Sequence, residues 1–427
     1  MQAANPSVMF LVFILATSLP AVAPDAGGVL QAATDVRINS ITAEDQAETA
    51  IAVNPVNPMN LFATWRDLRA GRTAIGHAFS LDGGTTWQDG VIDYPQADLL
   101  YDPSVGADSE GNFYLAFGID FLPAGSGSET WVMKSADGGA TLGPPVSAGP
   151  FIDKPFLGVD RATNAIYVAG NAVDSRGRGG VFITRSLDGG ASFTPLVTVD
   201  TRNGGLVNAP AFGPGGEVYL VWPHHGGGRV RVLFNRSLDG GATWLGREVL
   251  VASYRTTPTL LNGNVNAPHL VALASDRSAG PFAGRLYAAW HQGGNSGEDI
   301  VLSRSSDGGD TWSVPVRVND DLPGSAADQF LPWVNVDDAG RVHVTFLDRR
   351  DDPANVRFAL YLATSTDGGA TFGPNTRISD GAFPPSPATI FVGDYNAADV
   401  GGGVLHAIWA DGRDGDLDVF TEAVPLP

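Results

Sequence analysis

Six copies of one octapeptide constrain the fold of this chain more than any other feature of its sequence. Each copy reads Ser-x-Asp-Gly-Gly-x, followed by Thr or Ser and then, in five of the six, by Trp or Phe. The copies begin at Ser80, Ser135, Ser186, Ser237, Ser305 and Ser365. A short motif that returns in this way is typical of one supersecondary unit repeated along a chain. The sequence therefore predicts a repeat architecture before it indicates any activity.

The motif has a mechanical interpretation. An Asp side chain accepts backbone N–H groups, and two consecutive glycines tolerate positive φ, so the chain can reverse tightly between two strands. The aromatic residue that follows then covers the turn with an apolar ring. We therefore expect the motif carboxylates to fasten turns rather than to catalyse. They belong to Asp82, Asp137, Asp188, Asp239, Asp307 and Asp367.

A second repeat is more regular than the first. Seven short segments alternate large and small apolar residues, and they begin at Asn60, Asn112, Ala165, Glu217, Arg285, Arg341 and Val404. A shorter apolar segment with a polar start precedes each of them. Each unit then reads as an inner strand, a second strand, a third strand, the octapeptide turn and a fourth strand, which is the pattern of a four-stranded propeller blade.

The last unit ends without a fourth strand, and the segment from Asp35 to Ile41 could supply it. Closing the ring in this way would remove the exposed edge that an open sheet leaves. The sequence therefore predicts an all-β, seven-bladed propeller of antiparallel blades as a single domain over residues 34–427. A six-bladed ring with one irregular or extra unit is the alternative.

The octapeptides resemble the Asp-box, or BNR repeat, of the sialidase superfamily, and the resemblance covers most of the chain as repeats. It implies a β-propeller strongly and sialidase chemistry weakly, because lyases, other glycosidases and non-enzymatic receptors carry the same turn. Sialidases themselves have six blades, grip a substrate carboxylate with three arginines and use a Tyr/Glu nucleophile pair with an Asp acid/base. The nearest match to their first arginine segment is Arg37-Ile38-Asn39. Tyr395 beside Asp394 takes the place of a nucleophile, but no Glu pairs with it recognisably.

The N-terminus and the charge bear on location and partners. The apolar run from Val8 to Ala16 has the length of a signal-peptide core and is short for a membrane span, so residues 1–33 are predicted to be a signal peptide and processing region. We expect a secreted, periplasmic or cell-surface protein. The sequence has no cysteine, so packing and sheet hydrogen bonds must hold the fold. A net charge of −20 argues against nucleic acid and anionic membranes as partners.

Polar residues mark the start of each inner strand. They are Glu48, Asp102, Asp153, Asn208, Asn266, Asp328 and Asp394. If the blades are in register, these side chains converge as a ring of carboxylates and amides around the central axis, where like charges raise one another's pKa or recruit a cation. No cofactor is required, but Ca²⁺ could bind Asp102, Asp153 and Asp328. The alternative is that each residue caps its own strand.

The connections between second and third strands show an Asp two residues before an Arg in three units that ring closure makes neighbours. The pairs are Asp67 with Arg69, Asp348 with Arg350, and Asp411 with Arg413, and Arg66 and Arg349 lie beside them. Arginine suits bidentate binding of a carboxylate or sulfate, so these side chains are predicted to hold an acidic sugar. A salt bridge that pins each connection is the alternative.

Histidines occupy the equivalent connections of two other units, at His224, His225 and His291. Such side chains could move protons near neutral pH or contact substrate. His343 and His406 stand where other units have Tyr, and are expected in the core.

Taken together, the sequence favours an exported glycan-active hydrolase that acts on an acidic sugar or polysaccharide. Asp394, Tyr395 and Asp67 are its candidate catalytic residues. The arginines above, His224 and His291 are its candidate substrate contacts. A non-catalytic propeller that binds glycan or protein, a polysaccharide lyase acting on uronates and a purely structural role remain alternatives.

Overall fold

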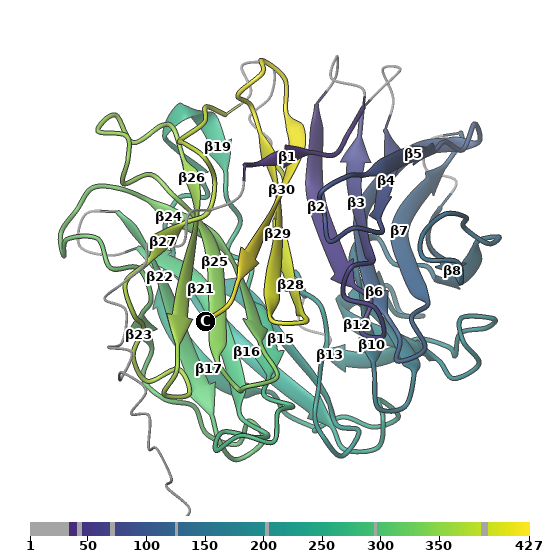
Figure 1. The fold of residues 1–427 in the computed structure, drawn as a ribbon. Coiled ribbons are helices and arrows are strands. Elements are labelled where there is room, and N and C mark those ends of the chain that lie inside the picture. The colour runs from purple at the N-terminus through teal and green to yellow at the C-terminus, as the bar shows by residue number, and fades with distance from the viewer. Residues whose placement is uncertain are drawn as a thin grey trace, which may run out of the picture. The chain divides into compact units, whose positions relative to one another are not determined.

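The protein is described here by a computed structural model that covers residues 34–40, 45–68, 73–123, 127–200, 205–293, 297–385 and 392–427. Within them the chain forms seven four-stranded antiparallel sheets, which we number blades I to VII in chain order (Figure 1). The predicted seven-bladed ring is confirmed. The predicted signal peptide lies outside the described residues. No helix among the described residues has the length and apolar character to cross a bilayer.

The strands of each blade follow the order predicted from the repeats. The innermost strands are β2 (Gln46–Val53), β6 (Ala97–Ala107), β10 (Asp153–Asp160), β14 (Ala211–Phe212), β20 (Ala272–Ser275), β24 (Gln329–Val336) and β28 (Ala397–Gly401). The second strands are β3 (Leu61–Asp67), β7 (Phe113–Phe121), β11 (Ala165–Val173), β15 (Val218–Gly226), β21 (Leu286–Gly293), β25 (Val342–Asp348) and β29 (Val404–Asp411).

The third strands are β4 (Ala74–Ser80), β8 (Ser128–Ser135), β12 (Gly179–Ser186), β16 (Arg229–Ser237), β22 (Glu298–Ser305), β26 (Ala359–Ser365) and β30 (Asp418–Pro425). The outer strands are β5 (Gln88–Ile92), β9 (Val146–Gly149), β13 (Val197–Asp200), β17 (Val249–Arg255), β23 (Val316–Arg317), β27 (Thr376–Arg377) and β1 (Val36–Arg37). A small hairpin of β18 (Leu260–Leu261) and β19 (Val265–Asn266), joined by a 3₁₀ turn at Asn262–Asn264, lies between blades IV and V in the chain.

Apolar contacts between neighbouring blades form the core. The second strands of blades I, IV, V and VII each carry a tryptophan near their end, and all four rings are fully buried: Trp65, Trp222, Trp290 and Trp409. Truncating a buried aromatic of this kind to Ala costs about 3–5 kcal/mol. The expected core histidines are also confirmed, since His343 and His406 are buried in β25 and β29.

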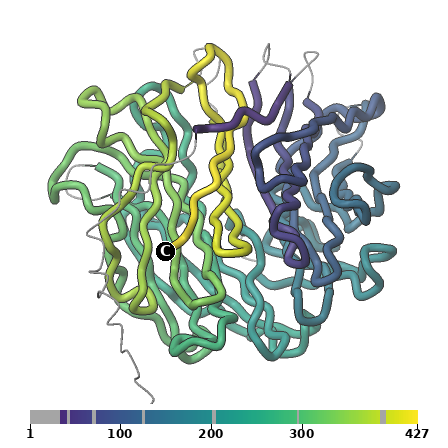
Figure 2. Tube along the Cα trace, in the orientation of Figure 1, coloured from purple at the N-terminus to yellow at the C-terminus, as the bar shows by residue number. Residues whose placement is uncertain are grey.

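The two ends of the described chain close the ring. Strand β1 pairs with β30, with Val36 opposite Thr421 and Arg37 opposite Phe420, so the predicted N-terminal fourth strand of blade VII is confirmed. Figures 1 and 2 show this purple strand across the yellow strands of blade VII and beside β2. The buried Asn39 then donates to Asp418 in blade VII (2.6 Å) and to Gln46 in blade I (2.9 Å).

All six Asp-boxes fasten their turns as the sequence predicts. In each copy the motif Ser donates to the Asp carboxylate, which also accepts the backbone N–H and the hydroxyl of the Thr or Ser four residues later, at 2.5–3.0 Å. The second motif glycine is needed at Gly309. Its φ is +93°, and a Cβ there would lie 2.1 Å from the ring of Phe234 in blade IV.

The strand order places these turns on one face of the ring, which we call the lower face. The connections into the inner strands and those from second to third strands emerge on the opposite, upper face, which is uppermost in Figure 1. The upper face therefore gathers the connections in which the sequence placed its candidate functional residues.

The Asp-box bonds give a first prediction. Asp307→Ala removes the acceptor for Ser305 and for both groups of Thr311, and we expect it to lower the free energy of unfolding by about 1 kcal/mol, since water competes at this exposed turn. The Thr311 and Ser305 bonds lower the pKa of Asp307 to about 2. The difference in the free energy of unfolding between the wild type and Asp307→Ala should therefore disappear as pH falls through 2. Urea unfolding measures both effects. Asp310 lies in the same turn and forms one ion pair with Arg236 of β16, so Asp310→Ala is the control and should cost less than about 0.5 kcal/mol.

Ring closure gives a second prediction. Asn39→Ala leaves buried groups of Gln46, Asp418 and Val419 without their Asn39 partner, so we expect a loss of about 2–3 kcal/mol in the free energy of unfolding. Within the described residues the adjacent exposed Ser40 bonds only Asp89, and Ser40→Ala should change stability by less than about 0.5 kcal/mol. Equal losses in the two variants would show that Asn39 does not fasten the seam.

Candidate active site

Several inner strands begin with the same backbone distortion at the upper face. In blades I, II, III and VI a β-bulge interrupts the pairing of the inner strand, and its first residue takes a left-handed conformation. These residues are Glu48 (φ +56°), Asp102 (+48°), Lys154 (+50°) and Leu331 (+50°). A bulge turns a side chain away from the regular alternation of the strand. In blades I to III the residue at this position is charged, and the three charged side chains lie close together near the axis.

The ammonium group of Lys154 lies at the centre of these charged side chains. Its Nζ lies 2.6 Å from Asp102 Oδ1, 2.6 Å from Asp394 Oδ2 and 3.7 Å from Glu48 Oε1. Lys154 is only 3% exposed. We call Glu48, Asp102, Asp153, Lys154 and Asp394 the axial cluster. It joins blades I, II, III and VII through one buried cation.

Further hydrogen bonds fix the orientation of the cluster. The backbone N–H of Asp102 donates to Glu48 (3.1 Å), and that of Lys154 donates to Asp102 (3.0 Å). Asn266, from the β18–β19 hairpin, donates to the second oxygen of Asp394 (3.4 Å). Arg66 at the end of β3 lies 3.9 Å from Glu48. The carboxylates are therefore held from several blades at once.

The cluster separates the pKa values of neighbouring carboxyl groups. Burial, followed by the charge of Asp102, raises the pKa of Glu48 to about 8 against the attraction of Lys154. Burial also opposes ionisation of Asp102, but Lys154 outweighs it and lowers that pKa. Burial alone would lower the pKa of Lys154, and the surrounding carboxylates raise it well above its ordinary value. At pH 7 Glu48 is therefore protonated beside an ionised Asp102.

Asp153 is the partly exposed acid of the cluster. Burial raises its pKa to about 6, and Asp102 and Asp394 reinforce the rise while Lys154 opposes it. Asp394 is paired with Lys154 and is the more exposed of the two carboxylates bonded to it, at 14% of its side chain against 4% for Asp102. The upper end of the axis thus offers one carboxyl that holds its proton up to about pH 6 and one that is ion-paired.

The structure corrects the expected even ring of polar residues. Asp328 does not join the others at the axis but bonds Arg349 (3.3 Å) and Asn355 (2.8 Å). Asn208 bonds the backbone N–H of its neighbour Ala209. The bulge brings Lys154 rather than Asp153 to the row occupied by Glu48 and Asp102 in blade III, and it brings Leu331 rather than Asp328 to that row in blade VI. The calcium site predicted at Asp102, Asp153 and Asp328 stays a prediction, and no group of three or more acidic or histidine side chains in the described part of the chain is arranged as a metal site.

Two of the predicted catalytic residues have their polar groups bonded to other partners. The hydroxyl of Tyr395 donates to the backbone carbonyl of Pro103 (2.9 Å), and its buried ring packs on Phe156. Asp67 is fully buried and accepts from the indole of Trp65 (3.2 Å). The ammonium of Lys154 lies over the ring of Tyr395, 5.7 Å from its centroid, so the structure brings Tyr395 as well as Asp394 to the axial cluster. The catalytic roles of Tyr395 and Asp67 stay predictions.

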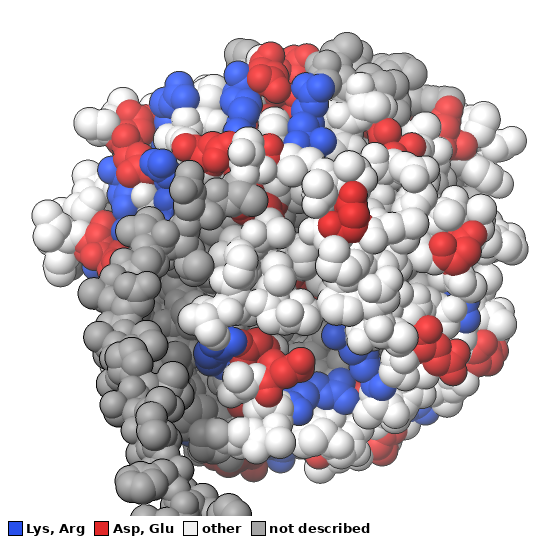
Figure 3. All heavy atoms as spheres, viewed as in Figure 1, with Lys and Arg blue, Asp and Glu red and all other residues white. Residues whose placement is uncertain are grey.

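The predicted arginines form the salt bridges that the sequence left as the alternative. Arg350 bonds Asp348 (2.8 Å) and lies over the ring of Tyr361, and Arg413 bonds Asp411 and Asp35. Arg349 is fully buried on Asp328. Figure 3 shows acidic and basic side chains interleaved along the upper edge on this side of the ring. Arg69 lies outside the described residues, so Arg66 is the predicted arginine that the structure places at the axial cluster.

The predicted histidines lie away from the axial cluster. His224 is half-buried and His225 exposed at the end of β15, whereas His291 is buried in β21. The ring of His291 stacks on His269 with centroids 4.9 Å apart, and burial lowers the pKa of His291 to about 3. His291 is therefore neutral at pH 7. Sequence reasoning passed over His269 because it stands in an apolar inner-strand segment.

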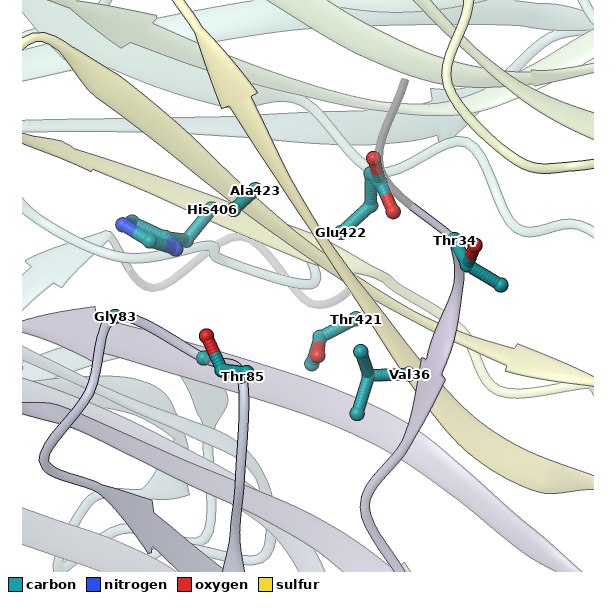
Figure 4. Close-up of a pocket in the computed structure, with 9 residues that line it drawn as sticks. Thr34, Val36, Gly83, Thr85, His406, Thr421, Glu422 and Ala423 are labelled. Carbon is teal, nitrogen blue, oxygen red and sulfur yellow. The ribbon is translucent and has the colours of Figure 1, made fainter. Parts of the chain in front are cut away.

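Two cavities lie away from the predicted site. One, of about 210 Å³, opens at the seam between blades VII and I (Figure 4) and is lined by Thr34, Val36, Gly83, Gly84, Thr85, His406, Thr421, Glu422 and Ala423. Another, of about 270 Å³, lies between the inner strands further along the axis. Neither is lined by a residue of the axial cluster.

Lys154 is the functional candidate that sequence analysis missed. A signal for it exists, since Asp102 and Lys154 each precede a proline at the start of an inner strand. Aligning the strands on that proline puts the two residues in one row, whereas aligning them on the first polar residue selects Asp153. Lys154 is also one of only two lysines in the sequence.

Comparison with known proteins adds fold neighbours. No family model and no curated protein matches the chain. A protein of unknown function from Dyadobacter fermentans matches with 13% identity and a TM-score of 0.50, covering 93% of this chain and 99% of its own. The GH93 α-L-arabinofuranosidase of Fusarium graminearum, solved with arabinobiose, matches with 13% identity and a TM-score of 0.50, covering 92% and 98%. A Hadza microbial sialidase matches with 14% identity and a TM-score of 0.49, covering 83% and 74%.

The structural neighbours thus include sialidases and GH93 arabinofuranosidases, as the Asp-box resemblance implied. Identities this low show a shared fold and leave substrate and activity to the site itself. The chain has an Asp-box β-propeller fold, which the GH93 α-L-arabinofuranosidase of Fusarium graminearum shares.

Proposed function

We propose that the protein is a glycoside hydrolase whose reaction centre is the axial cluster. Asp153 is the proton donor and Asp394 is the carboxylate, paired with Lys154, that acts on the opposite side of the scissile bond. Glycoside hydrolysis commonly uses two carboxyl groups in these two protonation states. The observation that carries the proposal is the pairing of a partly exposed carboxyl of raised pKa, Asp153, with a carboxylate bonded to a lysine, Asp394.

The other residues of the cluster act as positioning groups. Lys154 and Asn266 hold the two oxygens of Asp394, and Asp102 holds the backbone and ammonium of Lys154. Glu48 is buried and protonated, which limits the negative charge that Asp153 must face. For the acidic sugar expected from the sequence, Arg66 is the arginine at the cluster, with a side chain 23% exposed.

A binding propeller without chemistry is the second candidate function. It is favoured by the burial of Glu48, Asp102 and Lys154, which are each no more than 3% exposed. Charged groups buried in this way can hold the blades of the ring together without taking part in catalysis. Glycan binding would then use the surrounding upper face. The two candidates differ in whether a bound glycan is cleaved.

The deciding experiment incubates the full chain with sialosides, arabinofuranosides, uronic acid polymers and neutral glycans, and follows new reducing ends. Hydrolysis gives reducing ends without ultraviolet absorbance, whereas a lyase gives an unsaturated product that absorbs. Binding to one glycan without any product would favour the second candidate and contradict the proposal.

Substitutions in the cluster should abolish turnover selectively. We expect Asp153→Asn and Asp394→Asn each to lower kcat at least ~100-fold, because each removes a proton donor or a charge needed in the transition state. Asp174→Asn is the control, since Asp174 lies in an upper-face turn of blade III and bonds only its own turn. Its kcat should stay within about twofold of wild type. Retained activity in Asp153→Asn would remove Asp153 from the proposed role.

The pH profile provides an independent check on the same role. A proton donor is active only when protonated, so kcat/KM should fall as pH rises through about 6, the pKa that burial gives Asp153. A profile that continues to rise from pH 6 to pH 8 would contradict this assignment.

A further inference from the structure

A third cavity, of about 460 Å³, lies on the upper face between blades V and VI and shares no residue with the axial cluster. We call it the outer pocket. Glu298 at the start of β22, Asp328 before β24, and Thr257, Asn262 and Asn355 supply its polar side chains. Pro258, Leu260 and Leu261 supply apolar side chains. Its volume falls in the range of about 300–1,000 Å³ that is common for small-ligand sites.

The two carboxylates of the outer pocket differ in what they bond. Asp328 is fully engaged: one oxygen accepts from the backbone N–H of Glu298 (3.2 Å), and the other accepts from Arg349 (3.3 Å) and Asn355 (2.8 Å). The fully buried guanidinium of Arg349 therefore balances the charge of Asp328. Asp328 shapes the pocket without needing a ligand.

Glu298 has no such balance. It is 6% exposed, and its Oε2 is buried without a hydrogen-bond partner. A buried carboxylate oxygen without a partner costs more than an ordinary missing hydrogen bond, because the charge loses its solvation. No lysine, arginine or histidine is among the described residues that line the pocket. The outer pocket is thus lined by two acidic side chains: the charge of Asp328 is balanced by Arg349, and that of Glu298 is not balanced by a basic side chain of the lining.

We propose that the outer pocket binds a ligand with a protonated amino group on a ring-sized body, such as an amino sugar. The ammonium donates to Glu298 and balances its charge, and Thr257 and Asn262 offer partners for hydroxyl groups. The apolar side chains of Pro258 and Leu261 meet the carbon face of the ring. This inference does not depend on the proposed hydrolase activity, because it concerns a separate cavity and a binding equilibrium.

The surroundings of Glu298 make binding depend on pH. Burial raises the pKa of Glu298 to about 7, the neighbouring Thr257 hydroxyl lowers it, and the charges of Asp328 and Asp299 raise it. The phenol of Tyr254 is also within its electrostatic reach. An ammonium ligand favours the ionised form of Glu298. Affinity should therefore fall when acid protonates that carboxyl, although the ligand itself keeps its charge.

The test compares glucosamine with glucose, which differ at one ring position by an ammonium and a hydroxyl group. Titration of the full chain at pH 7, followed calorimetrically, should give at least ~10-fold tighter binding of glucosamine. Lowering the pH to 5.5 should weaken glucosamine binding roughly 15-fold, the change in the ionised fraction of a group with a pKa of 7. Glucose binding should not change over this range.

Substitutions test whether Glu298 causes the preference for glucosamine over glucose. Glu298→Gln keeps the size and polarity of the side chain but removes its charge, and should abolish the preference for glucosamine. Glu110→Gln, in an exposed turn of blade II, is the matched control and should keep it. Asp394→Asn should also keep the preference, which separates the outer pocket from the axial cluster. Equal binding of the two sugars by the wild type, or a preference that survives Glu298→Gln, would overturn the proposal. If Glu298→Gln does not fold, the pH dependence of the wild type decides.

Discussion

A single buried ammonium group organises the upper end of this propeller. The Nζ of Lys154 bonds carboxylates that arrive from blades II and VII, with the carboxyl of blade I beside them. Removing such a partner leaves buried charges uncompensated, at a cost of about 3–5 kcal/mol. Lysine suits this place because its charge is compact and its three donors point in different directions. The protonation states on which the proposed chemistry depends follow from this one cation.

Closure of the ring brings the carboxylates close to that cation. Asp394 and Glu48 are more than three hundred residues apart in the chain, and they meet because β1 completes blade VII and the seam at Asn39 holds blades VII and I together. The recurrent bulge then turns the first residues of the inner strands toward the axis. Closure and bulge are both backbone features, so the place of the cluster follows from strand pairing.

Charge on the upper face is largely paired, and the exceptions are informative. Arg350, Arg413 and Arg349 each neutralise an aspartate of their own connection or its neighbour, so they stabilise loops. Two acids stand out from this pattern. Asp153 keeps a raised pKa within the axial cluster, and Glu298 keeps an unbonded oxygen in the outer pocket. A proton donor is proposed at the first and a cationic ligand at the second.

The fold could be predicted almost entirely from the sequence, and the site only in part. Each blade carries its own local signals, namely the Asp-box turn and the alternating second strand, and the Asp35 segment was recognisable as the missing strand. Asp394 and Glu48 were placed at the axis because blade symmetry predicts their position. Lys154 was missed because a shift of one residue at a bulge changes which side chain faces the axis. The ion pairing of Arg350 and the burial of Glu298 depend on contacts between residues far apart in the chain, so no local sequence pattern predicts them.

The most direct test of the axial account is the titration of Glu48 itself. Glutamate-selective carbon-13 labelling of the full chain would follow each side-chain carboxyl by NMR from pH 4 to pH 10. The account predicts a resonance that titrates near pH 8 and disappears in Glu48→Gln, because burial beside Asp102 holds the proton. If the Glu48 resonance instead titrates near the ordinary glutamate value of about 4.3, the carboxyl groups at the axis are not separated as described.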